Sequence, residues 1–174
     1  MHLTLPFPEA LELALQGAPL PRPIGDLTCV GATVRADIDL RRVPSPPFAL
    51  RALAAVAPTV HVQATCRSFD AGKATFELAV RAASIPVQRL LNLLTPLVNT
   101  GLRSQHLPEG LVVVRPGPDG EPLAVLDLQA AVAIRTDGVT VTGFAIDDGA
   151  VEIAASVRGF VLRDPAVEAA TSAG

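Results

Sequence analysis

Asp37 and Asp39 have the spacing of a paired-carboxylate site and are the first candidates for chemistry in this chain. They are two residues apart in a stretch where apolar and polar residues alternate, so in a β-strand both carboxylates project from one face. Paired carboxylates are used for general acid–base catalysis. The same face also carries Arg35 and Arg41. Alternating charges of both signs are typical of a solvated strand face with ion pairs, and we predict that role for both aspartates.

Metal sites require several ligands on one side of the chain. Asp147-Asp148-Gly149 and Asp137 offer the oxygen ligands that Ca²⁺ prefers, but the EF-hand spacing is absent and hairpin turns favour the same residue types. His61, Cys66 and Cys29 offer nitrogen and sulfur ligands, but His61 and Cys66 are five apart and point to opposite faces of a regular strand. We therefore expect turns, a polar-face histidine and a core cysteine, and no metal.

Motifs for nucleotide binding and for hydrolysis are absent. The sequence contains no G-x-G-x-x-G fingerprint, no G-x-x-x-x-G-K phosphate loop and no G-x-S-x-G elbow. We expect a protein that is not an enzyme and needs no cofactor. An enzyme whose site has no recognisable motif ranks third, after the two non-enzymatic functions given at the end of this section.

The length, composition and charge exclude several classes of protein. The length of 174 residues favours one domain, and 49% hydrophobic residues with 18% charged residues exclude general disorder. The net charge of −3 and the small aromatic fraction of 3%, all of it Phe, argue against nucleic-acid binding. No run of 18 apolar residues predicts a membrane-spanning helix.

Strands are predicted wherever apolar and polar residues alternate with period two. These stretches are 30–41, 60–67, 73–81, 111–115, 128–135, 139–146 and 150–162, with an edge strand near residues 3–7. Ser68–Gly72, Asp137-Gly138 and Asp147–Gly149 have the composition of hairpin turns, and the alternation changes parity at Gly143, which indicates a bulge. One apolar and one polar face are typical of an antiparallel sheet covered on one side.

Helices are predicted over 8–16 and, more clearly, over 86–103, where leucines recur at three- and four-residue steps and Pro96 predicts a kink. Residues 48–57 fit a helix or a strand, and we assign them to a strand. The predicted fold is therefore a single α+β domain over residues 1–163, with a flexible C-terminal tail over 164–174.

The cellular location follows from the opening residues and the cysteines. MHLTLPFPEALELALQG has no basic start, long apolar run or small-residue cleavage site, so we expect no signal peptide and a soluble cytoplasmic protein with both cysteines reduced. Removal of an upstream segment would instead place the protein at the cell envelope.

Small residues on the apolar strand faces indicate either close packing of a helix or space for an apolar guest. The guest would be lined by alanines of the strands and leucines of the long helix, namely Ala32, Ala36, Ala64, Ala74, Leu90, Leu94 and Leu97.

One family shows the same order of elements. Residues 84–114, SIPVQRLLNLLTPLVNTGLRSQHLPEGLVVV, combine an amphipathic helix with Leu-Pro-Glu-Gly and a strand, and residues 139–153 read VTVTGFAIDDGAVEI. Over residues 26–162 the chain resembles the LmeA-like bacterial domain of the tubular lipid-binding (TULIP) superfamily. The resemblance implies a curved antiparallel sheet that wraps the long helix, and an apolar groove that holds acyl chains.

The leading functional expectation is therefore non-enzymatic binding of a lipid or other hydrophobic ligand in a groove between sheet and helix. The alternative is a structural or protein-interaction module, including a homodimer, with a filled groove. The partner classes left open are a hydrophobic small molecule, a membrane surface contacted peripherally, and a second copy of the chain.

Overall fold

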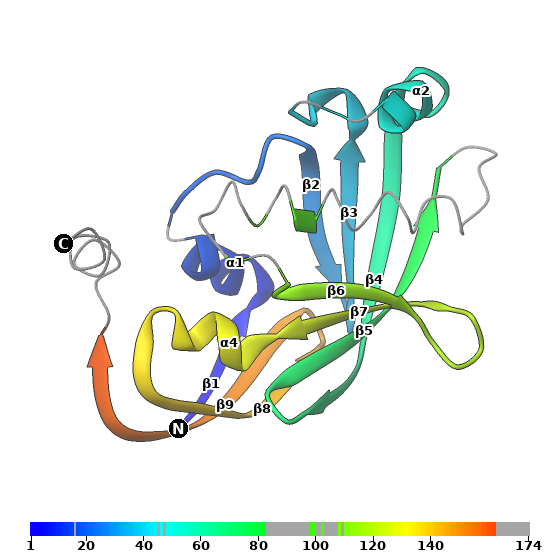
Figure 1. Ribbon diagram of the computed structural model, residues 1–174. Helices are drawn as coiled ribbons and strands as arrows, with labels where there is room; N and C mark the ends of the chain where they lie inside the picture. Colours follow the sequence, from blue (N-terminus) through cyan, green and yellow to red (C-terminus); the bar gives the residue numbers. More distant parts are fainter. Residues whose placement is uncertain are drawn as a thin grey trace.

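The computed structural model describes residues 1–15, 17–44, 46, 48–82, 98–99, 102, 108 and 110–162. This part of the chain is mostly antiparallel β-sheet with a few short helices, which fits the α+β class (Figure 1). The predicted helix over 86–103 lies outside the described residues except for Val98, Asn99 and Leu102, which are helical. The predicted tail over 164–174 lies outside them as well, so a sheet wrapped around a long helix stays a prediction.

The larger sheet has six strands in the order β2-β3-β4-β5-β7-β6. Their bounds are β2 Ile24–Val30, β3 Thr33–Asp39, β4 Thr59–Asp70, β5 Lys73–Arg81, β6 Val112–Pro116 and β7 Pro122–Asp127. The smaller sheet has the order β1-β9-β8, with β1 His2–Pro6, β8 Thr136–Asp147 and β9 Ala150–Leu162. The predicted hairpins β4–β5 and β8–β9 are confirmed, and the register of β8 and β9 shifts between Val141 and Gly143 as the parity change predicted.

Three strand predictions need correction. The stretch 30–41 is not one strand, because β2 ends at Val30 and a turn at Gly31, with φ +59°, precedes β3. The alternation continued through this turn and concealed it. Strand β2, IGDLTCV, was missed where it follows the Pro-rich stretch that ends at Pro23, and β7 was missed because its sequence, PLAVLD, is apolar on both faces and shows no alternation.

Two predicted strands are helices. Residues 48–57 form α2 (Phe48–Val56), which buries Leu50 and Ala54 at helical spacing. Residues 128–135 hold α4 (Leu128–Ala133), whose N-cap Asp127 accepts a hydrogen bond from the Ala130 N–H at 2.8 Å. The apparent alternation of 128–135 came from alanines, which fit either structure. The predicted first helix is confirmed as α1 (Phe7–Leu15).

The hydrophobic core lies between the six-stranded sheet and α2, together with the short 3₁₀ helix η1 (Leu40–Arg42). Leu40 is 1% exposed, and Leu50 packs in the same cluster with residues of β4 and β5, namely Val60, Leu78 and Val80. Both helical elements cover one end of the sheet (Figure 1).

The smaller sheet contacts the opposite end of the larger one. The rings of Phe76 in β5 and Phe144 in β8 meet edge to face with centroids 6.1 Å apart. The β8–β9 turn is also joined to the β2–β3 turn, because the Gly149 N–H donates a hydrogen bond to the Gly31 carbonyl at 3.0 Å. The six-stranded sheet is therefore closed at one end by α2 and η1 and at the other by β8 and β9.

Gln129 of α4 links the two sheets. Its backbone N–H donates to the Gly72 carbonyl in the β4–β5 turn at 3.0 Å. Its side-chain amide donates to the Val139 carbonyl at 3.0 Å and accepts from the Val141 N–H at 2.8 Å. The side chain thus satisfies backbone groups of β8 as a neighbouring strand would.

Gln129→Glu is expected to lower the free energy of unfolding by about 1–3 kcal/mol, because a carboxylate cannot donate to Val139 and faces its carbonyl with like charge. Gln63→Glu is the matched control, since the side chain of Gln63 makes no hydrogen bond with another described residue. Urea unfolding followed by circular dichroism measures both variants. Equal stabilities would show that the Gln129 amide does not hold β8.

Candidate functional site

The candidate site is the apolar face of the six-stranded sheet. Its residues follow from the strand register, in which Ala36 of β3 lies opposite Val62 of β4, and Val62 lies opposite Val80 of β5. The middle of this face is formed by side chains of β3 and β4 that are only half-buried, namely Val34, Ala36, Val62, Ala64 and Cys66. Both ends are closed by the packing described above, and in the middle Val62 and Ala64 stay half-buried although they also pack against the core cluster.

The predicted ligand-lining residues occupy different places. Ala36 and Ala64 lie diagonally across β3 and β4 in the half-buried middle of the apolar face. Ala74 is on the same face but 0% exposed, and Ala32 lies in the β2–β3 turn, where its carbonyl accepts from the Cys66 N–H at 3.2 Å. The three predicted leucines, Leu90, Leu94 and Leu97, lie outside the described residues.

Both cysteines are free thiols on this face, since Cys29 lies opposite Val34 and Cys66 opposite Phe76. Burial raises the pKa of the Cys29 thiol above its ordinary value. Burial also raises the pKa of the Cys66 thiol, and a hydrogen bond with the backbone of Ile146 opposes this with a smaller effect. The thiolate is therefore disfavoured at neutral pH, and both side chains act as small apolar groups toward the site.

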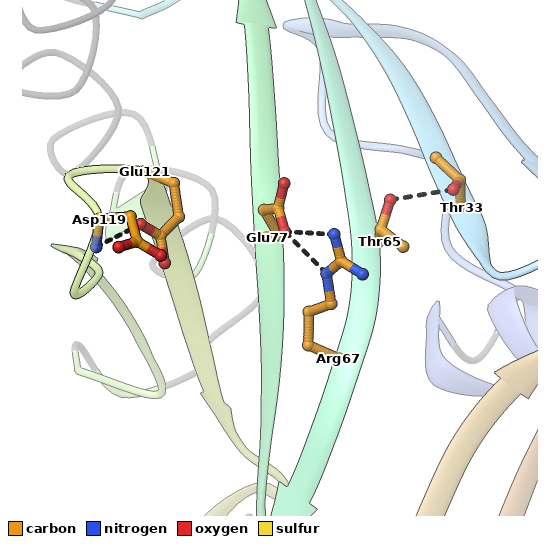
Figure 2. A network of polar contacts seen from close by, with 6 residues as sticks. All are labelled: Thr33, Thr65, Arg67, Glu77, Asp119 and Glu121. Atoms are coloured by element: carbon orange, nitrogen blue, oxygen red, sulfur yellow. Dashed lines mark hydrogen bonds and ion pairs between the residues drawn. The ribbon is translucent and has the colours of Figure 1, made fainter.

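The opposite face of the sheet carries polar side chains that pair across neighbouring strands. His61 Nδ1 and Asp37 Oδ1 are 2.6 Å apart, and both side chains are exposed. Thr33 and Thr65 share a hydrogen bond of 3.0 Å, and Arg67 Nε donates to Glu77 Oε2 at 2.7 Å (Figure 2). The predicted polar face with ion pairs is present, but Asp37 pairs with His61 and Asp39 with Arg42, and no ion pair of Arg35 or Arg41 is found among the described residues. His61 and Cys66 lie on opposite faces as predicted.

Asp39 and Asp147 have local roles at turns. Asp39 caps η1 by accepting from the Arg41 N–H at 3.0 Å, and its other oxygen pairs with Arg42 at 3.3 Å. Asp147 accepts from the Asp148 N–H at 3.0 Å in the β8–β9 turn. Within the described ranges, no three His, Cys, Asp or Glu residues come together as ligands for a metal ion.

A second feature, missed in the sequence, is a surface hollow of about 330 Å³ between η1 and α2. Its lining combines a buried floor with two guanidinium groups, through Leu40, Arg41, Pro46, Arg51, Ala54 and Ala55. A signal was present, because residues 40–58 contain three arginines and no acidic residue.

Comparison of the chain with protein-family models, with curated proteins and with solved structures finds no match. Among the described residues, no helix has the length and apolar character needed to cross a membrane.

Proposed function

We propose that this protein binds a hydrophobic ligand, such as an acyl chain, without catalysing a reaction. The observation that carries the proposal is the half-buried middle of the apolar sheet face, where Ala36 and Ala64 are diagonal neighbours. The resemblance to the tubular lipid-binding domains supports the same function.

The chemistry of the face fits an apolar guest better than a polar one. The half-buried side chains of this region end in methyl groups, apart from the Cys66 thiol. The charged residues of β3 and β4, including Arg35, Asp37 and His61, alternate onto the opposite face. A guest that lost about 300 Å² of apolar surface to the protein would gain about 7 kcal/mol before ordering costs, so net affinity is expected to be micromolar or weaker.

Ala36→Phe and Ala64→Phe are expected to abolish binding because the added ring fills the space that the guest would occupy. Titration with a fluorescent fatty acid measures this, and the absence of Trp and Tyr from the chain leaves the probe signal free of intrinsic fluorescence from those residues. Ala79→Phe is the matched control, because Ala79 lies opposite Gln63 on the polar face of β5 and is exposed.

Saturable binding by the wild type and by Ala79→Phe, with loss in both other variants, would support the proposal. Absence of saturable binding by the folded wild type would overturn it. Equal binding by all four proteins would place the guest elsewhere on the molecule.

The alternative function is a protein-interaction module, including a homodimer. It is favoured by the far end of β9, where Val157 and Val161 are exposed and the described residues place no strand beside β9 on its β1 side beyond Ala155. Exposed strand edges with apolar side chains are sites of pairing with another chain. Sedimentation equilibrium over a range of protein concentrations distinguishes a homodimer from a monomeric binder.

A further inference from the structure

The outer face of α2 is apolar and exposed. Phe48 is 84% exposed and Val56 is 73% exposed, although Leu50 and Ala54 of the same helix are buried. Ala52 and Ala55 lie between the two large side chains on the outer face, and both are exposed. One helix thus has two apolar faces, of which only the inner one is explained by the core.

Three arginines lie on or near this outer face. Arg51 is part of α2, and Arg41 and Arg42 belong to the adjoining η1. The only acidic group among their described partners is Asp39, which pairs with Arg42. Arg51 donates to the Pro46 carbonyl at 3.0 Å, which leaves its charge uncompensated by any described acidic residue. The region therefore carries a local positive charge of about two in a chain whose net charge is −3.

The hollow between η1 and α2 places two of these charges around one cavity. Arg41 and Arg51 both line it, together with the buried Leu40 and Ala54 and the exposed Ala55. A phosphate group fits such a pair of guanidinium groups, because arginine donates several hydrogen bonds in a planar fork.

We propose that α2 and η1 form a docking surface for an anionic lipid bilayer. Phe48 and Val56 enter the interfacial region, and Arg41 and Arg51 hold a lipid phosphate at the hollow. This docking does not depend on the hydrophobic ligand proposed above, because the ligand site lies on the apolar sheet face.

The shape of the surface favours a bilayer over an acidic protein. Phe48 and Val56 are separated by eight residues of helix, about 12 Å, and stand out individually from a convex helix. Helices that lie on a membrane place their apolar side chains about 5–10 Å deep in the bilayer interface, which accepts protruding side chains without a matching pocket. Helix α2 also lies at the end of the larger sheet remote from the smaller sheet, so a flat surface can reach it (Figure 1).

Co-sedimentation of the full chain with vesicles tests the proposal. Vesicles of phosphatidylcholine alone are compared with vesicles of phosphatidylcholine and phosphatidylglycerol in equal parts. We expect binding to the anionic vesicles only, in spite of the net negative charge of the protein, and a decrease in binding with added salt.

Arg41→Gln with Arg51→Gln is expected to lower the partition coefficient about 20- to 30-fold, since each arginine near an anionic surface contributes about fivefold. Arg115→Gln with Arg158→Gln removes the same charge from exposed positions in β6 and β9 and is expected to leave binding unchanged within about twofold. Phe48→Ser is expected to weaken binding severalfold, and Leu13→Ser, at an exposed leucine of α1, is its control.

Equal binding to neutral and anionic vesicles, or equal losses in the two arginine pairs, would overturn the proposal. Retention of full binding by Phe48→Ser would also overturn it, because adsorption would then be purely electrostatic. Binding of a soluble polyglutamate peptide that depends on Arg41 and Arg51 but not on Phe48 would assign the surface to an acidic protein instead. The fatty-acid titration contains no vesicles, so it tests ligand binding alone. Failure of ligand binding and failure of membrane docking can therefore be told apart.

Discussion

Gly72→Ala is expected to lower the free energy of unfolding by about 2–5 kcal/mol, a large part of the stability of a small domain. Gly72 is the second central residue of the β4–β5 turn and has φ +81°, which costs an L-residue about 1–2 kcal/mol. An added Cβ would lie 2.6 Å from the Cβ of Gln129. That atom sits directly on the backbone of α4, so the helix itself must shift, at a further cost of about 1–3 kcal/mol.

Gly149→Ala is the matched control for this clash. Gly149 occupies the same position in the β8–β9 turn and has φ +73°. The residues before the two glycines, Asp148 and Ala71, also have similar φ values, near +45°. A Cβ at Gly149 would meet only the Cys29 carbonyl oxygen at 3.9 Å, an ordinary contact. We expect a cost of only about 1–2 kcal/mol. Circular dichroism during urea unfolding measures both variants, and equal losses would show that α4 does not sit over the β4–β5 turn.

The strands that the sequence predicted well are those with one face toward solvent. In β3 and β4, apolar residues such as Ala36 and Val62 alternate with polar residues such as Arg35 and Gln63, because the two faces meet different environments. Strand β7 lies between β5 and β6 and carries apolar residues toward both faces, so its sequence lacks that contrast. Alternation of apolar and polar residues therefore indicates that one face of a strand is solvated, and a strand without a solvated face can lack it.

Short alanine-rich segments were the main source of error. Alanine is compatible with both faces of a strand and with a helix, so the alternating Leu128, Ala130 and Val132 did not distinguish the two. The informative residue was Asp127, whose side chain caps α4 and is a helix start signal. For α2, the burial of Leu50 beside an exposed Val56, six residues further on, identifies a helix rather than a strand.

For the candidate site, the sequence predicted which side chains share a face but not which of them meet. Cross-strand pairs such as Asp37 with His61 depend on register, which is set by the turns and bulges between strands. Ala32 was predicted to line the groove because it continues the parity of Ala36, but a turn displaces it from the strand. The arginines of residues 40–58 indicate a basic segment, but the hollow at Arg41 and Arg51 depends on η1 and α2 packing side by side, which the local sequence does not show.

Leu50→Ala is expected to cost about 2–5 kcal/mol in the free energy of unfolding. Leu50 is 2% exposed and packs in the core cluster with Leu40, Val60 and Leu78, so truncation loses burial and leaves a cavity. Val56→Ala is the matched control in the same helix, where a 73% exposed side chain is expected to change stability by less than about 0.5 kcal/mol.

This pair also separates a helix from a strand over residues 48–57. Residues 50 and 56 are six apart, so in a strand both side chains would lie on one face and both truncations would have similar effects. In a helix the two positions are about 120° apart around the axis, so one side chain is buried while the other is exposed. Urea unfolding of both variants therefore measures whether α2 buries Leu50 against the sheet, and similar losses would contradict the placement of α2 that both the core and the docking surface require.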